Sequence, residues 1–160
     1  MAIASRVHDY MTRHGLRYDV LDHPPSHCSM ETAQLAHVPG DSLAKTVVLE
    51  DDYGYLMAVL PSTQHVRLGW LGKELNCRLR LASEAEIARM FTDCEPGAVP
   101  PLGAAYGLRT VVDDSLASKP EIYFEAGDHE RLIQMSGADF MAMMAHASHA
   151  RFGEPRWHGH

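Results

Sequence analysis

Between residues 95 and 107 the chain carries three prolines and three glycines. Proline removes a backbone N–H and glycine weakens regular structure, so neither a helix nor a central strand can run through this segment. Such long irregular stretches are uncommon inside compact domains and are often functional. The glycines leave backbone amides accessible to a carbonyl, carboxylate or phosphate group, although a rigid connector would have the same composition.

The segments around this loop alternate between strand and helix patterns. Helices are expected at residues 4–14, 30–38, 65–75, 84–91 and 137–149. Strands are expected at residues 18–21, 43–50, 55–60, 78–81, 109–112, 121–125 and 131–135. Because hairpins outnumber crossover units, the pattern predicts an α+β fold with a mixed sheet instead of a doubly wound parallel sheet.

The length of 160 residues indicates a single domain, expected over residues 1–150, followed by a flexible His-containing tail over 151–160. Hydrophobic residues make up 46% and charged residues 22%, which excludes a disordered chain. The sequence has no apolar run long enough to span a membrane, and its first residues do not resemble a secretory signal. Three widely spaced cysteines are not typical of a disulfide framework, so a reduced, cytoplasmic protein is expected.

The formal net charge of −7 bears on the class of partner. A nonspecific nucleic-acid binder needs a broad basic face, so we expect no DNA partner. A local basic patch for one end of an RNA remains compatible with this charge.

Lys45 is anomalous within its expected strand. Side chains two residues apart share one face of a strand, so Lys45 falls on the greasier face with Leu43, Val47 and Leu49. A buried amine is costly unless it is paired, which favours an acidic partner or a ligand. The alternative is that Lys45 lies at the end of the strand and extends its amine to water.

Other candidate residues give weaker signals. His129 lies on an expected turn between two strands, where it could donate a hydrogen bond or act as a base, or could be a lone surface histidine. His146 and His149 have the spacing of a helical metal chelate, but histidines near a chain end are more often incidental. Cys28 has no base that the sequence identifies. No dinucleotide or phosphate-loop motif is present, so neither a metal nor a cofactor is expected.

These features occur together, in order, in three segments: TAQLAHVPGDSLAKTVVLE (32–50), EPGAVPPLG (95–103) and FEAGDHERLIQMSGADF (124–140). With these segments the chain resembles the YbaK and prolyl-tRNA synthetase-associated domain family of aminoacyl-tRNA deacylases, and the match covers about residues 20–144. The resemblance implies a mixed, largely antiparallel sheet curled into an open barrel with surrounding helices. It implies a free-standing trans-editing enzyme that hydrolyses the ester of mischarged aminoacyl-tRNA. The site residues implied are Lys45 as the catalytic residue and, for substrate binding, Thr46, Gly97, Ala98, Val99, Pro100, Pro101, Gly103 and His129.

An aminoacyl ester is already activated, so such a site needs only to position water and stabilise the developing oxyanion. The expected partners are the acceptor end of a mischarged tRNA and, as a further candidate, an aminoacyl-tRNA synthetase. A basic patch is expected around Lys45, Lys73 and either Arg78 or Arg80. The alternative is a noncatalytic amino-acid or aminoacyl-tRNA binding module of the same fold, although such a module could lose Lys45 freely. Ser62 and His65 depart from the residues common in the family, which leaves the edited amino acid open.

Overall fold

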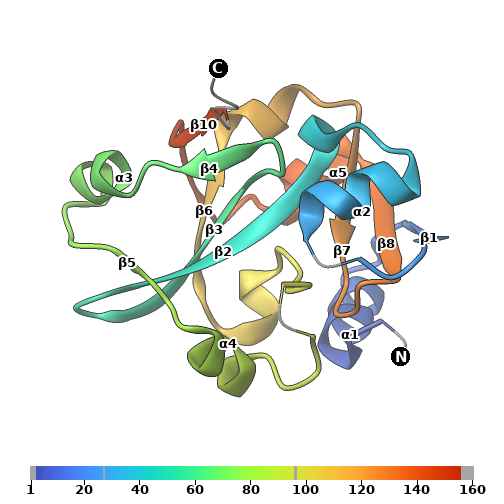
Figure 1. Ribbon diagram of the computed structural model, residues 1–160, viewed down its shortest axis with the longest axis horizontal. Coiled ribbons are helices and arrows are strands. Elements are labelled where there is room, and N and C mark those ends of the chain that lie inside the picture. The colour runs from blue at the N-terminus through green and yellow to red at the C-terminus, as the bar shows by residue number, and fades with distance from the viewer. Residues whose placement is uncertain (1–2, 27, 96, 156–160) are drawn as a thin grey trace.

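The structure is a computed structural model that describes residues 3–26, 28–95 and 97–155. The helices are α1 (Ser5–Arg13), α2 (Ser29–Ala36), α3 (Leu68–Leu75), α4 (Glu84–Met90) and α5 (Gly137–Met143), with short 3₁₀ helices η1 (Gly40–Ser42), η2 (Gly103–Tyr106) and η3 (Asp114–Ser118). The strands are β1 (Asp19–Asp22), β2 (Leu43–Asp51), β3 (Gly54–Pro61), β4 (Gln64–Val66), β5 (Arg80–Leu81), β6 (Arg109–Asp113), β7 (Glu121–Glu125), β8 (Arg131–Ser136), β9 (Ser148–Ala150) and β10 (Gly153–Pro155). Figure 1 shows the helices arranged around a curved sheet.

The main sheet is mixed. Its strand order is β1–β8–β7–β2–β3–β6–β9, with β5 paired to β2, while β4 and β10 form a separate two-stranded sheet. The pairs β1–β8, β7–β8, β2–β3 and β2–β5 are antiparallel, and the pairs β2–β7, β3–β6 and β6–β9 are parallel. The predicted α+β fold with a mixed sheet is therefore confirmed.

The β2–β3 hairpin is the longest paired unit, and its turn explains where the two strands end. Asp51 and Gly54 form the last pair of the hairpin. The Asp51 carboxylate accepts the Tyr53 amide at 2.7 Å, and Gly54 has a φ of +130°, a conformation that side chains rarely adopt. The strands predicted over residues 43–50 and 55–60 are therefore confirmed, and they pair as a hairpin.

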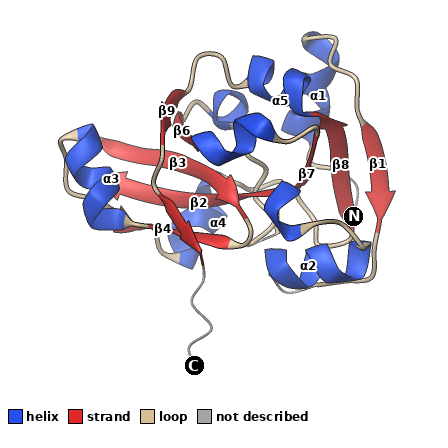
Figure 2. Cartoon of the chain, turned by 90° about the horizontal axis from the view of Figure 1, so that it is seen from above, coloured by secondary structure: helices blue, strands red, loops and turns tan. Residues whose placement is uncertain are grey.

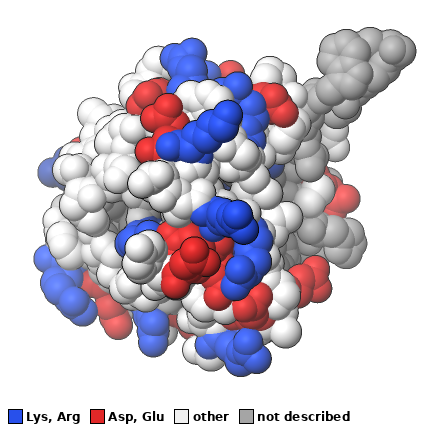
Figure 3. All heavy atoms as spheres, turned by 90° about the vertical axis from the view of Figure 1, so that its left-hand side faces the viewer, with Lys and Arg blue, Asp and Glu red and all other residues white. Residues whose placement is uncertain are grey.

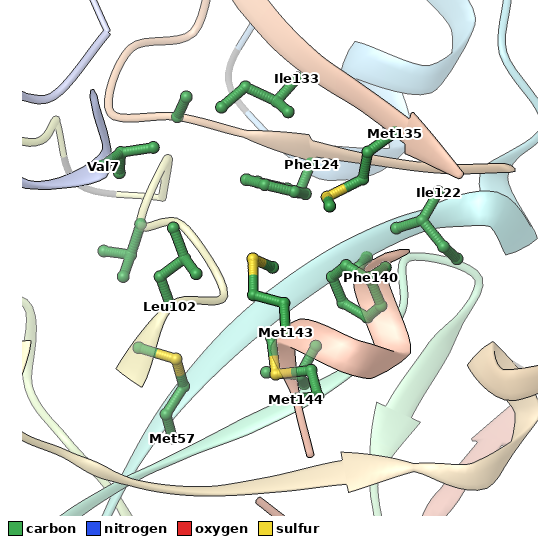
Figure 4. Packing of buried hydrophobic residues seen from close by; sticks show 14 of the residues in the cluster. Val7, Met57, Leu102, Ile122, Phe124, Ile133, Met135, Phe140, Met143 and Met144 are labelled. Carbon is green, nitrogen blue, oxygen red and sulfur yellow. The ribbon is translucent and has the colours of Figure 1, made fainter. Parts of the chain in front are cut away.

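The larger hydrophobic core lies between β2, β3, β7 and β8 on one side and α1, α5 and the proline–glycine loop on the other (Figure 4). Phe124, Phe140 and Met57 are fully buried in it, and Leu102 of the loop is 2% exposed. Burying a side chain of this size stabilises a fold by about 1.5–3 kcal/mol. The loop is therefore anchored in the core by its own apolar residues.

The opposite face of the sheet has cores of its own. Leu49 and Leu60 pack with Leu71 of α3 and with Phe152, and Leu43 packs with Leu132 beneath α2. Figure 2 shows α2 on one side of the β1–β8–β7 part of the sheet and α1 and α5 on the other. Both faces of β2 are thus covered, which explains why its sequence is apolar at consecutive positions.

The C-terminal part differs from the prediction. The helix expected over 137–149 ends at Met143, and Ser148–Ala150 forms β9 beside β6. His149 lies in β9, so His146 and His149 do not share a helix, and the helical spacing noted for a metal chelate does not exist in the structure. Three of the six residues from 145 to 150 are alanines, which favour a helix, so the pairing of residues 148–150 with β6 prevails over local helix propensity.

The segment expected to be a flexible tail also contains a strand. Gly153–Pro155 pairs with β4, and Phe152 before it is fully buried. β4 occupies the start of the helix expected over 65–75, so α3 begins only at Leu68. The structural reason is that β4 and β10 complete each other's hydrogen bonds, a long-range pairing that the local pattern does not reveal. Residues 156–160 of the predicted tail lie outside the described residues.

Candidate functional site

The site predicted from sequence lies where β2 and β7 diverge. These strands pair in parallel only at Leu43 with Tyr123 and at Ala44 with Phe124. The next positions in the same register are Lys45 and Glu125. Because side chains alternate along a strand, Lys45 and Glu125 project from the same face of the sheet. The structure leaves the Lys45 residue half-buried.

The proline–glycine loop reaches this opening from the other side of the sheet. Gly127, just beyond β7, donates its amide to the Ala98 carbonyl at 3.0 Å, and its own carbonyl accepts the Glu95 amide at 2.7 Å. Figure 1 shows the loop in yellow in the space between β2 and β7. Val99 and Leu102 of the loop are buried in the larger core, and Ala98 is 1% exposed. The loop is therefore held by apolar packing as well as by its hydrogen bonds to Gly127.

Two glycines of the loop have different roles. Gly97 is exposed and has a φ of +83°, which a side chain would strain. Gly103 lies against β6, and a Cβ there would stand 1.9 Å from the Thr110 hydroxyl and 2.8 Å from the Leu108 carbonyl. Both glycines are therefore required by the backbone path of the loop.

The loop offers fewer backbone donors than its length suggests. Pro100 and Pro101 are buried and have no N–H. The Ala98 amide is already bonded to the Glu95 carbonyl at 3.1 Å. If the loop binds an oxyanion, the Ala98 amide is therefore already occupied, and the amides on either side of it, those of Gly97 and Val99, are candidate donors.

His129 is brought to the loop by the β7–β8 turn. Its amide donates to the Glu95 carboxylate at 3.2 Å, so loop and turn are joined by a second contact. Its ring Nδ1 lies 3.5 Å from Oε1 of Glu125, and the His129 side chain is only 13% exposed. His129 is therefore not the lone surface histidine that the sequence left open.

Glu125 is a buried carboxylate that the sequence analysis did not identify. Thr32 of α2 donates its hydroxyl to Glu125 Oε1 at 2.7 Å. The Ser26 hydroxyl lies 2.5 Å from the Thr32 hydroxyl, and the Ser26 amide donates to the His129 carbonyl at 3.2 Å. Glu125, Thr32, Ser26 and His129 therefore form a buried polar network, which we call the Glu125 network.

The Glu125 network has a defined electrostatic character. Burial raises the pKa of Glu125, while the Thr32 hydroxyl and the charges of His129 and His23 act in the opposite direction. His23 is 7% exposed and donates from Nδ1 to the Pro24 carbonyl at 2.8 Å. A buried carboxyl with a raised pKa beside imidazoles is typical of functional sites. The sequence shows Glu125 as an acidic residue at the end of a predicted strand. It does not show that this strand pairs with the strand that carries Lys45, so Glu125 could not be assigned to the site from sequence.

Thr46 lies on the other face of β2 from Lys45. It projects on the side of Ala44 and Val48, which belong to the larger core. Its hydroxyl is buried and has no hydrogen-bond partner among the described residues. A role for Thr46 in substrate binding stays a prediction.

The predicted basic patch is divided. Lys73 and Arg78 line a cavity of about 720 Å³ beside α3, together with Asp52 and Cys77. Arg80 forms an ion pair with Glu50 at 2.8 Å, roughly 16 Å along β2 from Lys45 at the rise of a strand. On the face that includes α3, basic and acidic side chains are interspersed (Figure 3). The prediction of one patch that includes Lys45 is therefore wrong.

Two further searches bear on the class of site. Within residues 3–26, 28–95 and 97–155, no group of three His, Cys, Asp or Glu side chains could hold a metal ion. None of the helices in the same ranges is both long and apolar enough to cross a membrane. Cys28 is exposed just before α2, and its backbone carbonyl lies 3.1 Å from the Thr32 hydroxyl of the Glu125 network.

Comparison with solved structures shows the fold. A hypothetical protein superposes with a TM-score of 0.83 at 23% identity, covering 94% of this chain and 100% of the other. A proposed trans-editing enzyme for prolyl tRNA synthetase superposes with a TM-score of 0.82 at 22% identity, covering 94% of this chain and 96% of the other. A proposed signal transduction protein from Marinobacter aquaeolei has a TM-score of 0.77 at 21% identity, but only 31% of that longer chain is covered.

Comparison of the sequence identifies the family. Among curated proteins, no sequence matches the chain. The family model described as the aminoacyl-tRNA editing domain matches residues 23–143, which include Lys45, the proline–glycine loop and the Glu125 network. The chain therefore belongs to the aminoacyl-tRNA editing domain family.

Proposed function

We propose that the protein hydrolyses the ester bond of mischarged aminoacyl-tRNA as a free-standing trans-editing deacylase. The proposal is carried by two observations in a chain of the editing family. Lys45 follows the last β2–β7 pair, and the β7–β8 turn that carries His129 is hydrogen-bonded to the proline–glycine loop. The similarity in fold to a proposed trans-editing enzyme for prolyl tRNA synthetase supports the same assignment.

Each part has a chemical task in this proposal. The Lys45 ammonium binds the acceptor end through its phosphate or sugar oxygens, or polarises the ester carbonyl. An amide of Gly97 or Val99 donates to the oxyanion that forms when water attacks the carbonyl. The loop is fixed in the core at Ala98 and Leu102, so these amides need little reorganisation during the reaction.

The two departures from the family pattern have structural partners. Ser62 is fully buried and donates its hydroxyl to the Gly40 carbonyl at 2.5 Å. His65 is exposed and lies 2.7 Å from the Glu154 carboxylate. These interactions are with Gly40 and Glu154 and not with Lys45 or the proline–glycine loop. The two departures from the family pattern are therefore compatible with deacylation.

The proposal is tested with tRNAs loaded with Ala, Ser or Cys, the wild-type chain and Lys45→Ala. We expect hydrolysis of at least one ester and a loss of about a hundredfold or more in Lys45→Ala. Lys119→Ala is the matched control, because Lys119 forms an ion pair with Asp41 at 3.0 Å outside the candidate site. This control is expected to stay within roughly twofold of wild type.

The outcomes separate the two candidate functions. If the folded wild-type chain hydrolyses none of the esters but binds aminoacyl-tRNA, the protein is a binding module and the proposal is wrong. If Lys45→Ala remains as active as Lys119→Ala, Lys45 has no catalytic part even though the enzyme is a deacylase.

A further inference from the structure

We propose that Glu125 is a positioning residue that fixes the ring orientation and tautomer of His129, so that His129 Nε2 accepts a proton from the attacking water. This inference rests on the proposed function, and it assigns a role to Glu125, a buried residue next to His129.

The first support is the placement of the two side chains. They are four residues apart across the β7–β8 turn, with Glu125 Oε1 3.5 Å from His129 Nδ1. Glu125 is 6% exposed and His129 13% exposed, so neither reaches far into solvent. A contact of this length is loose for a hydrogen bond, and catalytic hydrogen bonds often tighten only when substrate binds.

The second support is that the turn does not need Glu125. Asp128 accepts the amides of Glu130 and Arg131 at 3.1 and 2.9 Å, and it accepts the Arg131 guanidinium at 2.8 Å. These contacts fix the backbone between β7 and β8. The Glu125 carboxylate is therefore not required to shape the turn, and within the turn the side chain that it faces is the His129 imidazole.

The third support is the chemistry of the pair. A carboxylate can only accept hydrogen bonds, so a hydrogen bond between ionised Glu125 and His129 requires the ring hydrogen on Nδ1. In a neutral imidazole the lone pair is then on Nε2, as in other carboxylate–histidine pairs of hydrolytic enzymes. The pair thus selects the tautomer that a general base requires.

The remaining groups around Glu125 hold it in place. Thr32 donates to the same oxygen, Oε1, and the Ser26 hydroxyl lies beside both Thr32 and, at 3.4 Å, the His129 carbonyl. His23 is the other imidazole that acts on Glu125, and Lys45 is its neighbour in the strand register. Ser26 therefore ties the carboxylate side of the pair to the backbone of the histidine.

The burial of Glu125 supports a functional role. A buried carboxylate is unfavourable unless it is fully hydrogen-bonded, and burial raises the pKa of Glu125 above its usual value. Such a residue weakens the fold compared with an apolar one, which is typical of groups that serve a site.

The hydrolytic step balances without another reactant. Water forms a bond to the ester carbon and gives one proton to His129 Nε2, which produces the tetrahedral oxyanion. The bond between that carbon and the ribose oxygen then breaks, and the same proton moves from Nε2 to the departing ribose oxygen. The products are the free amino acid and a tRNA with its terminal hydroxyl restored.

The kinetic test is a double-mutant cycle of Glu125→Gln and His129→Ala, measured as kcat and KM over pH. Glu125→Gln is expected to lower kcat by about 10–100-fold with little change in KM, because the Gln amide can donate to Nδ1 and invert the tautomer. The double variant should be no slower than His129→Ala alone. Glu121→Gln, an exposed residue of the same strand, is the matched control and should keep the wild-type profile.

Two results would overturn the proposal: Glu125→Gln as active as wild type at every pH, or a Glu125→Gln loss that persists undiminished in the His129→Ala background. The latter would show that Glu125 acts through the fold and not through His129.

A nitrogen-15 NMR measurement of the His129 ring separates this inference from the proposed function. A wild-type ring protonated on Nδ1, and a changed tautomer ratio in Glu125→Gln, would support the pair even if no ester is hydrolysed. A wild-type neutral ring protonated on Nε2 would refute it even in an active deacylase.

Discussion

Asp113 and Glu125 are both buried carboxylates at the ends of strands, but the protein surrounds them differently. Asp113, the last residue of β6, accepts four hydrogen bonds: from the Ser115 amide and hydroxyl and from the amides of Phe152 and Gly153. Glu125, the last residue of β7, accepts from the Thr32 hydroxyl and faces an imidazole at 3.5 Å.

The difference appears in how readily each group ionises. Burial raises the pKa of Asp113, but the hydrogen bonds from Ser115, Gly153 and Phe152 outweigh it and hold that pKa below its ordinary value. For Glu125 burial prevails and the pKa is raised. A carboxylate saturated by backbone amides stabilises a fold, whereas one left with few donors beside a histidine is available for chemistry.

The largest expected effect is at the structural carboxylate. Asp113→Ala leaves the buried Phe152 amide and the half-buried Gly153 amide without their acceptor, so we expect a loss of about 3 kcal/mol in the free energy of unfolding. Urea unfolding monitored by circular dichroism measures it. Deacylation per folded molecule should remain near wild type, and a selective loss of kcat in this variant would break the distinction between the two carboxylates.

A smaller effect is expected at the donor to Glu125. Thr32→Val keeps the shape of a fully buried side chain but removes the hydroxyl that Glu125 accepts. We expect a loss of about 1–2 kcal/mol in unfolding free energy and a fall in kcat of roughly threefold to tenfold through the less ordered histidine. Unfolding and single-turnover deacylation on the same preparation measure both. A variant that loses stability but no activity would place Thr32 in the fold alone.

The pH dependence of stability should have opposite signs at the two carboxylates. Because the folded-state pKa of Asp113 is lowered, its stabilising contribution is present above its unfolded pKa and is lost as pH falls through the folded value. The folded-state pKa of Glu125 is raised, so between the unfolded and folded values the native state binds the extra proton and stability falls as pH rises.

Glu125→Gln removes that titration. The free energy of unfolding of this variant should equal that of wild type at pH values below the pKa of an unfolded glutamate. At pH 8 the variant should be the more stable of the two proteins. Chemical unfolding of both proteins across this range checks the sign. If the stability advantage of Glu125→Gln over wild type instead increases as the pH falls, the Glu125 carboxylate stabilises the fold as Asp113 does.

The sequence predicted the parts of this comparison that depend on local pattern. Two apolar segments separated by a short polar stretch predicted the strands of the β2–β3 hairpin. Ser83 and Glu86 form a capping box at the start of α4, a local signal that a sequence displays directly. The proline–glycine loop was recognised because proline and glycine exclude regular structure wherever they lie.

The Glu125 network could not be predicted in the same way. Thr32 and Glu125 are distant in sequence, and they meet only because α2 covers the face of the sheet to which β7 contributes. The same holds for Asp113, which depends on β10 returning to β4. Contacts between elements depend on strand order, and strand order leaves no mark in the periodicity of any one strand.

The smallest expected effect comes from the second histidine–glutamate pair. His65 and Glu154 are closer than His129 and Glu125, at 2.7 Å against 3.5 Å, but both side chains are nearly half exposed. Water screens an exposed pair and ordering two side chains offsets its attraction, so His65→Ala should lower unfolding free energy by less than about 0.5 kcal/mol. Thermal unfolding in low and high salt measures this, and deacylation should not change. A loss of activity equal to that of His129→Ala would show that proximity, and not burial at the divergence of β2 and β7, distinguishes the functional pair.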